Sequence, residues 1–379
     1  MKKPVIKCKI KEMKTLYVHI PFCGQKCFYC SFVVAVGQER AIDRYLDCLA
    51  REMLSYRLEE IKTVYVGGGT PTLLSAGQLC RLCGLICEHF RFRPGIEWTV
   101  EANPEGLTAE KLTVMKAAGV NRISLGVQTL NDKYLRYLGR NHDARSAQDA
   151  YRRIRDAGYT NVSIDMMLSF PGQTGGEIKE DARLLIRLHS DHFSLYTLSV
   201  EENSRFYTRN IAQNNGRGQA RHYQWACAIL RDGGYAQYEV SNFARPSKAA
   251  EHNLNYWQGG QYIGLGVGAH SYLGSIRSWN VSRLQEYFTR IEQGKPAQDG
   301  SETLTPYDQM KESLLFGLRM NLGVELEALA GRYGCFPSDA QMQKIDDFVR
   351  SGFLVRSGSF LRASARGRMV LDELCAQLV

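Results

Sequence analysis

Short runs of hydrophobic, often β-branched residues recur through the first two thirds of the chain, and a segment that suits a helix follows each run. Alternation of this kind predicts parallel strands joined by helical crossovers. Each run ends in polar or glycine-rich residues. We therefore expect an α/β protein with six such strands, at residues 15–20, 63–68, 97–104, 122–128, 161–168 and 192–200.

The strand pattern alone leaves two architectures open, a barrel-like (β/α) sheet and an open doubly wound sheet. In a barrel the carboxyl ends of the strands form one face, so residues far apart in sequence converge there. Unusual residues follow the six strands in turn: the cysteines of the first, GGGTPT, Glu101, Gln128, Asp165, and Tyr196 with Thr197. The sequence thus predicts one pocket assembled from several strand ends.

After about residue 233 the sequence changes to short segments rich in glycine and aromatic residues: YAQYEVSNFA, HNLNYW and YIGLGVGAHSYLG. We interpret residues 233–300 as strands and loops that close or cover the barrel. They complete an expected first domain of residues 1–300.

The last part of the chain, residues 301–379, is helical again at both ends. Between them, residues 348–367 predict a helix end followed by a small hairpin, as in a winged-helix-like module. Because no low-complexity linker is present, we place the boundary of this α+β domain between residues 294 and 305.

The charge balance changes this picture little. The chain has 48 Lys and Arg against 39 Asp and Glu, a formal charge of +9, which favours anionic partners. The basic residues are scattered, without a run of like charges or a basic-aromatic stripe, which is typical of a solvated surface. A nucleic-acid partner is the less favoured interpretation.

The distribution of apolar residues does not suggest a membrane protein. The basic start MKKPVIKCKIKEMK lacks the apolar core of a signal peptide, and no stretch of about eighteen apolar residues occurs. We therefore expect a soluble cytoplasmic protein without stable membrane insertion. The cytosol keeps thiols reduced, so the eleven cysteines are expected to be buried thiols or metal ligands.

Three of these cysteines, Cys23, Cys27 and Cys30, lie within eight residues directly after the first strand. Thiolates suit iron-sulfur clusters and zinc, and this spacing lets one loop wrap a metal centre. A structural zinc site needs four protein ligands, whereas the local count stops at three. Three cysteines without a fourth ligand suit a metal centre that keeps one coordination position open. Buried structural cysteines and part of a zinc site are the alternatives.

A second group, Cys80, Cys83 and Cys87, has similar spacing but lies in a segment with helical periodicity. Leu79, Leu82, Cys83 and Ile86 share that period, so we interpret the group as core thiols of a helix rather than a second cluster. The remaining cysteines, at positions 8, 48, 227, 335 and 375, are isolated.

The string YVHIPFCGQKCFYC closely resembles the cluster loop of radical S-adenosylmethionine (SAM) proteins, in the branch of anaerobic coproporphyrinogen III oxidases and HemW-type heme chaperones. The resemblance implies a partial (β/α)6 TIM-like barrel with a HemN-type C-terminal domain. It also implies a [4Fe-4S] cluster on Cys23, Cys27 and Cys30, whose open iron is chelated by the amino and carboxylate groups of SAM, and a flavodoxin- or ferredoxin-like electron donor. Reduction of the cofactor there would yield a 5′-deoxyadenosyl radical.

The same resemblance implies a set of SAM-contacting residues, most of them at strand ends: Tyr17, Tyr29, Gly68, Gly69, Thr70, Glu101, Gln128, Arg140, Asp165, Thr197 and His270. Taken singly, Glu101 and Asp165 also suit helix caps, and Arg140 suits a surface charge. Ser169 departs from the pattern, because the family usually has glycine at that position.

Three features distinguish the two branches. Coproporphyrinogen oxidases usually have a fourth cysteine where this chain has Phe32, and a longer arm than the 22 residues before Cys23. In addition, His252–Trp257 matches the HNxxYW motif that resembles the heme-binding signature of the chaperones. Histidine is a normal axial ligand of heme iron, so we expect His252 to bind heme.

The alternative for His252 is a loop histidine bonded to backbone, with Tyr256 and Trp257 in a minor core. With all three features together, we expect a chaperone that binds heme and passes it to an acceptor protein. An oxygen-independent coproporphyrinogen III oxidase and a radical SAM enzyme acting on nucleic acid are the alternatives.

Overall fold

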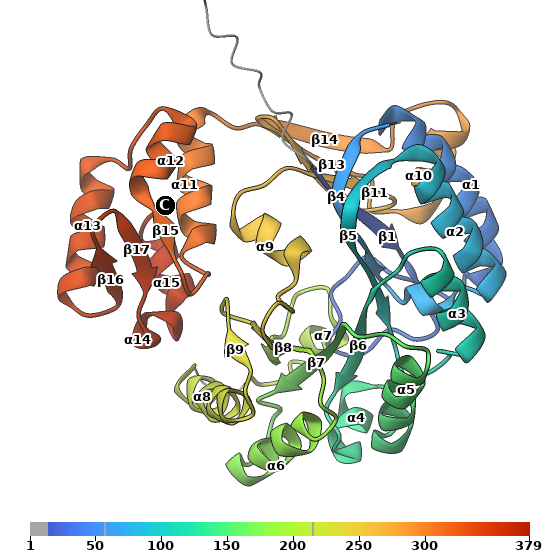
Figure 1. Cartoon of the computed structure of the whole chain (residues 1–379), viewed down its shortest axis with the longest axis horizontal. Coiled ribbons are helices and arrows are strands. Elements are labelled where there is room, and N and C mark those ends of the chain that lie inside the picture. Colours follow the sequence, from blue (N-terminus) through green and yellow to red (C-terminus); the bar gives the residue numbers. More distant parts are fainter. Residues whose placement is uncertain (1–13, 57, 214–215) are drawn as a thin grey trace, which may run out of the picture.

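The computed structural model describes residues 14–56, 58–213 and 216–379. The expectations for Cys8 and for the rest of residues 1–13 lie outside the described residues. Figure 1 shows a strongly curved sheet with helices along its outer side and a smaller C-terminal unit beside it.

Six neighbouring strands of this sheet are parallel, which confirms the βα pattern of the sequence. Their order along the sheet is the order along the chain: β1 (Lys14–Ile20), β4 (Glu60–Gly68), β5 (Arg91–Ala102), β6 (Arg122–Gln128), β7 (Val162–Leu168) and β8 (His192–Thr197). Sequential order with helices on the outer side is the arrangement of a partial barrel rather than of a doubly wound sheet (Figure 1).

The helices between these strands lie on the convex side of the sheet (Figure 1). They are α1 (Ile42–Met53), α2 (Ala76–His89), α3 (Ala109–Ala117), α4 (Asp132–Leu138), α5 (Ala144–Asp156) and α6 (Gly175–Ile186). Two more helices, α7 (Arg205–Thr208) and α8 (Gly216–Asp232), follow β8. Several begin with a side-chain cap; Ser75 and Thr174, for example, form capping boxes with Gln78 and Glu177.

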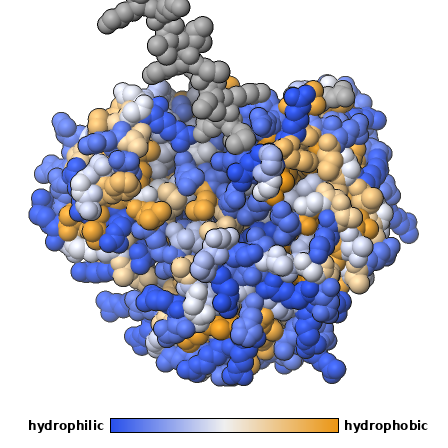
Figure 2. All heavy atoms as spheres, in the orientation of Figure 1, coloured by the Kyte–Doolittle hydropathy of each residue, from blue (hydrophilic) through white to orange (hydrophobic). Residues whose placement is uncertain are grey.

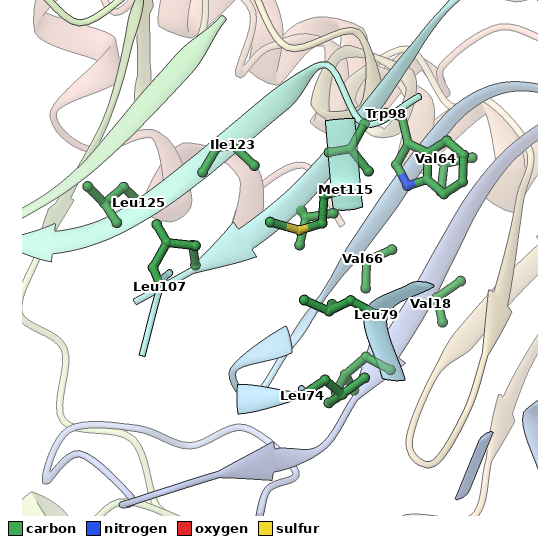
Figure 3. Packing of buried hydrophobic residues seen from close by; sticks show 14 of the residues in the cluster. Val18, Val64, Val66, Leu74, Leu79, Trp98, Leu107, Met115, Ile123 and Leu125 are labelled. Atoms are coloured by element: carbon green, nitrogen blue, oxygen red, sulfur yellow. The ribbon is translucent and has the colours of Figure 1, made fainter. Parts of the chain in front are cut away.

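The main core lies between the sheet and the outer helices. Figure 3 shows Val64, Val66 and Trp98 of the strands packing near Leu79 of α2 and Met115 of α3. All five side chains are almost completely buried. Because these hydrophobic side chains point outward, toward the helices, polar side chains can occupy the inner side of the barrel. A functional site can form there.

Residues 233–303 extend both edges of the sheet. Strands β9 (Ala236–Gln237) and β10 (Asn242–Ala244) continue from β8, whereas β11 (Tyr262–Leu265) pairs with β1 and is followed by β12 (His270–Leu273), β13 (Ile276–Asn280) and β14 (Gln298–Thr303). Helix α10 (Leu284–Glu292) precedes β14. The expectation of strands and loops is wrong for HNLNYW, because α9 (Glu251–Trp257) is a helix, lying between the two arms of the sheet in Figure 1.

The C-terminal unit has a hydrophobic core of its own, built from residues between Met310 and Leu378. It consists of α11 (Pro306–Gly317), β15 (Val324–Glu325), α12 (Leu326–Tyr333), α13 (Asp339–Arg350), β16 (Leu354–Ser357), β17 (Phe360–Ala363), α14 (Ala365–Arg368) and α15 (Leu371–Ala376). The helix and hairpin expected within residues 348–367 are present. Since β14 of the large sheet ends at Thr303, we propose that the division falls near residue 304 rather than at 300.

The second cysteine group lies on α2, but only Cys83 is buried; Cys80 and Cys87 are exposed, so the expectation of three core thiols was wrong. The buried face of α2 consists of Leu79, Leu82, Cys83, Ile86 and His89. In the face shown in Figure 2, hydrophilic residues predominate and hydrophobic ones form small separate groups. Among the described residues, no helix is long and apolar enough to cross a membrane.

Candidate cluster and cofactor site

The loop that carries the three cysteines is fixed at both ends. Strand β2 (Phe22–Cys23) pairs in parallel with β3 (Ala35–Val36), and the Ala35 N–H donates to the Pro21 carbonyl at 2.7 Å. This short pairing, which the sequence did not reveal, holds Cys23 at the edge of the barrel face.

The middle of the loop is fastened to two helices. The N–H of Phe28 donates to the carbonyl of Leu138 at 2.9 Å, and the N–H of Phe206 donates to the carbonyl of Phe28 at 2.9 Å. Gly139 ends α4 with φ of 71°, and a Cβ at this position would lie 2.8 Å from the Phe28 ring. Only glycine combines this backbone conformation with this close contact.

The thiols of Cys23, Cys27 and Cys30 border one cavity of about 410 Å³ at the carboxyl ends of the strands. Within the described residues, no three metal-ligating side chains converge tightly enough to hold a single ion. A cubane spreads its thiolates more widely than one ion does, so an iron-sulfur cluster suits these positions. Burial raises the pKa of Cys23 to about 11 and also raises that of Cys30. Bound metal offsets this cost by stabilising the thiolate forms.

A chain of hydrogen bonds connects two of these cysteines through the barrel face. The Cys23 Sγ lies 3.4 Å from the Thr70 hydroxyl, which accepts from Asn103 Nδ2 at 3.0 Å. Arg140 donates to Asn103 Oδ1 at 2.8 Å and to Cys27 Sγ at 3.5 Å. Arg140 is therefore part of the site rather than a surface charge. Sequence reasoning missed Asn103, although it stands two residues after Glu101 at the same strand end.

The segment GGGTPT lies against the cysteine loop. A Cβ on Gly69 would lie 2.7 Å from the Phe22 carbonyl oxygen, so only glycine permits this close approach of the two backbone segments. Three amide groups of this segment already have hydrogen-bond partners within the chain. The N–H groups of Gly68, Gly69 and Thr70 donate to Glu101, Ile20 and Phe22, respectively.

Two carboxylates face the cavity from β5 and β7, the strands on either side of β6. Glu101 accepts from the Tyr65 hydroxyl at 2.7 Å and from the Gly68 N–H at 3.0 Å, and Asp165 accepts from the Ser124 hydroxyl at 3.1 Å. Neither caps a helix. Burial raises the pKa of Glu101 to about 7 and also raises that of Asp165. Tyr65 and Ser124 are further site residues that the sequence analysis missed, because nothing in their local sequence distinguishes inward-facing strand residues from core residues.

The structure brings most of the expected SAM residues together. With the three cysteines, the same cavity is lined by Tyr29, Gly68, Gly69, Thr70, Glu101, Gln128, Arg140, Asp165 and Thr197. Tyr17 and His270 border an adjoining groove instead, which shares Gly68 and Glu101 with the cavity.

Two residues at the barrel face hold left-handed backbone without being glycine. Gln128 has φ of 67° at the end of β6, and Ser169 has φ of 69° just after β7. The Ser169 N–H donates to Gln173 Oε1 at 2.7 Å, and its hydroxyl lies 3.1 Å from His222 Nδ1. Residues other than glycine are strained here, and such strain is concentrated at functional sites. The backbone at Ser169 is thus the kind that glycine adopts most easily.

His252 borders neither the cavity nor the groove. It lies in the first turn of α9 and is 1% exposed; its Nδ1 lies 2.8 Å from the Thr63 hydroxyl, and its Nε2 lies 3.0 Å from the Tyr256 hydroxyl. Burial lowers the pKa of His252 to about 3, so the ring is neutral. Its neighbour Asn253 reaches the cavity. Iron ligation by His252 thus requires α9 to open, and that role stays a prediction.

Comparison with protein families gives two matches. The radical SAM superfamily matches residues 17–185, and the HemN C-terminal domain matches residues 304–370. The first match spans β1 to α6 and contains the cysteine loop, and the second covers most of the C-terminal unit.

Among individual proteins, the heme chaperone HemW of Bacillus subtilis (strain 168) is 36% identical over 375 residues, covering 96% of this chain and 98% of that protein. HemW of Escherichia coli (strain K12) is 30% identical and covers 95% of this chain and 96% of its own. The mitochondrial radical S-adenosyl methionine domain-containing protein 1 of Bos taurus is 31% identical and covers 97% and 88%.

A solved structure shares the whole fold. Coproporphyrinogen III oxidase (HemN) from Escherichia coli superposes with a TM-score of 0.86, at 24% identity, over 97% of this chain and 90% of that one. This likeness confirms the partial barrel with its C-terminal domain.

Proposed function

Because this chain belongs to the HemW heme chaperone family of the radical SAM superfamily, we propose that it binds heme and delivers it to an acceptor protein. The observation that carries the proposal is identity of 30–36% with these chaperones over nearly the full length of both chains. The radical SAM relationship also implies a [4Fe-4S] cluster and SAM.

We assign the cluster to Cys23, Cys27 and Cys30. Three thiols bordering one cavity, with a buried cation at Arg140 beside Cys27, suit a centre that needs thiolates and one open corner. When bound, the cluster would supply single electrons to a SAM molecule in the adjoining cavity. The electron donor in this proposal is a small flavodoxin- or ferredoxin-like protein.

We assign SAM to the cavity beside the cluster. Glu101 and Asp165 supply acceptors for an amino group or a ribose, and Arg140 supplies a positive charge for a carboxylate. Gln128, Thr197 and Tyr29 complete the wall. In this proposal these residues hold and orient the cofactor.

A coproporphyrinogen oxidase remains the second candidate, because the fold matches HemN so closely. Phe32 argues against the oxidase assignment, because it occupies the position of the fourth cysteine of that branch. Its side chain is 65% exposed. An exposed phenyl ring cannot ligate metal, but it offers hydrophobic surface to a flat ligand.

One pair of assays separates the candidates. The full-length protein, reconstituted without oxygen, is titrated with hemin and, separately, incubated with coproporphyrinogen, SAM and a reductant. We expect a saturable Soret change with hemin and no catalytic formation of protoporphyrinogen. Protoporphyrinogen formed over many turnovers, or no hemin binding, would overturn the assignment. A steeply salt-dependent affinity for RNA would instead favour the nucleic-acid alternative.

A further inference from the structure

Asn103 is the first residue after β5, and its side chain lies between Thr70 and Arg140. Each of these neighbours contacts a different cysteine of the loop. Thr70 contacts Cys23, and Arg140 contacts Cys27. Asn103 therefore joins two arms of one hydrogen-bond chain, and each arm ends at a sulfur atom.

The chemistry of its neighbours fixes the orientation of the Asn103 amide. A guanidinium only donates hydrogen bonds, so the amide atom that lies 2.8 Å from Arg140 Nη2 is the carbonyl oxygen Oδ1. The amide nitrogen Nδ2 then faces Thr70 and donates to its hydroxyl oxygen at 3.0 Å. The hydroxyl hydrogen of Thr70 is therefore left to point toward another acceptor.

That acceptor is the sulfur of Cys23. The Cys23 Sγ lies 3.4 Å from Thr70 Oγ1, and either atom can donate while the thiol carries its proton. A cysteine that binds metal is a thiolate and has no proton to donate, so Thr70 becomes the donor. The second arm runs from Arg140 Nη1 to Cys27 Sγ at 3.5 Å. Donors thus point at two of the three cysteine sulfurs.

The surroundings of Asn103 hold its side chain in this orientation. Its N–H donates to Thr72 Oγ1 at 3.4 Å. On the neighbouring strand β6, a Cβ on Gly126 would lie 3.0 Å from Asn103 Oδ1, so the glycine leaves room for the amide and the guanidinium to meet. The Gly126 carbonyl also accepts from Arg140 Nη2 at 2.7 Å, which fixes the position of the guanidinium.

Hydrogen bonds to the sulfurs are one of the means by which a protein sets the reduction potential of an iron-sulfur cluster. Reduction adds negative charge, part of which lies on the sulfur ligands. A donor directed at a sulfur therefore stabilises the reduced state more than the oxidised state and raises the potential. The positive charge of Arg140, from which both arms start, acts in the same direction.

Resting on the proposed function, we propose that Asn103 is a positioning residue that raises the reduction potential of the [4Fe-4S] cluster. It directs the Thr70 hydroxyl toward Cys23 and holds Arg140 against Cys27. One electron passes from the reduced donor protein to the oxidised cluster, and no proton is transferred. The amide of Asn103 makes this transfer more favourable without touching the cluster.

The test measures the midpoint potential of the cluster in the reconstituted full-length protein without SAM. The electron paramagnetic resonance signal of the reduced cluster is followed over a series of applied potentials. Asn103→Leu removes both amide contacts without adding charge, and its cluster should be about tenfold harder to reduce, a potential about 59 mV lower. Asn103→Asp should lower the potential further, because a carboxylate accepts from Thr70 and turns the hydroxyl away from Cys23.

Asn141→Asp is the matched control for charge. Asn141 is exposed and lines a small pocket of about 120 Å³ that Asn103 and Cys27 also line. The control adds the same charge near the loop, breaks no contact of the chain and should leave the potential close to that of the wild type. Thr70→Val removes only the arm to Cys23 and should give a smaller fall than Asn103→Leu. Thr70→Ser keeps the hydroxyl and should keep the wild-type potential.

A merely structural role of Asn103 would lower the amount of cluster without moving the potential of the cluster that remains. A wild-type potential in Asn103→Leu would therefore overturn the proposal and leave the cluster assignment standing. If Asn103→Leu assembles no cluster, equal potentials of Thr70→Val and Thr70→Ser would overturn it instead. Absence of a cluster from the reconstituted wild type would overturn the cluster assignment as well.

Discussion

Arg140 Nη1 donates to the Sγ of Cys27 at 3.5 Å. The other terminal nitrogen of the same guanidinium donates to Asn103 Oδ1 at 2.8 Å and to the Gly126 carbonyl at 2.7 Å. One side chain thus joins the cysteine loop to the ends of β5 and to β6. Burial alone would lower the pKa of Arg140, but its electrostatic interactions with Tyr29, Cys27 and Glu105 raise that pKa above its usual value.

Replacing this cation should weaken the hold on the cluster. Hydrogen bonds to charged groups contribute about 1.5–3 kcal/mol each, so Arg140→Met should lose iron about tenfold faster than the wild type during anaerobic desalting. Iron and sulfide content against time measures the loss. Arg136→Met, which removes an exposed arginine from α4, the helix that ends just before Arg140, is the control and should behave as wild type. Equal retention by both variants would remove Arg140 from the cluster site.

The carboxylate of Glu101 should make SAM binding depend on pH. Burial raises the pKa of Glu101 to about 7, so this acceptor is charged above pH 7 and neutral below it. If the charged form binds SAM, affinity should fall roughly fivefold between pH 7 and pH 6, by simple titration. Isothermal titration across this range measures the effect, and Glu101→Gln should bind weakly with a flat profile. A flat profile in the wild type would contradict this role.

The same raised pKa has a consequence for stability of the SAM-free protein. A carboxyl whose pKa is higher in the folded state stabilises the fold below about pH 4.5 and loses that contribution as pH rises through about 7. Glu101→Gln should therefore flatten the decline in the free energy of unfolding between these values. Urea denaturation at several pH values measures how the free energy of unfolding changes with pH. A steeper decline in the variant than in the wild type would contradict the prediction.

Gly139, which ends α4 beside the cysteine loop, should tolerate a methyl group poorly. With φ of 71° and a Cβ position 2.8 Å from the Phe28 ring, Gly139→Ala should cost about 1–2 kcal/mol from backbone strain alone. The control is Gly84→Ala in α2, where nothing lies within 4 Å of the added methyl group. That change should instead stabilise the protein by about 0.5–1 kcal/mol. Thermal unfolding of the two variants should shift in opposite directions.

The sequence predicted the parallel strands because their hydrophobic runs are local and long, and it predicted the cavity because parallel strands bring their carboxyl ends to one edge. Gln128 and Asp165, far apart in the chain, therefore meet as expected. Local pattern could not reveal the β2–β3 pairing, because each strand has only two residues. Nor could it show that the amides of GGGTPT are used internally.

The HNxxYW segment is a second example of a feature that local sequence could not predict. His252 contacts Thr63, 189 positions away, and Asn255 contacts Thr15, 240 positions away. Contacts of such separation decide whether a histidine is a buried structural residue or an accessible ligand. The six residues of the motif do not reveal these long-range contacts. Their residue types alone therefore could not distinguish a heme ligand from a buried structural histidine.

His252→Ala should therefore reveal a structural role first. The change leaves the hydroxyls of Thr63 and Tyr256 without their ring partners and removes a side chain packed 5.0 Å from the Tyr65 ring. Unpaired buried groups cost about 1–3 kcal/mol each, so a loss of roughly 2–4 kcal/mol is expected. Urea denaturation measures it, and the exposed His189→Ala should stay within about 0.5 kcal/mol of wild type. Unchanged stability of His252→Ala would mean that α9 opens readily, and the buried ring would then be free to reach heme iron.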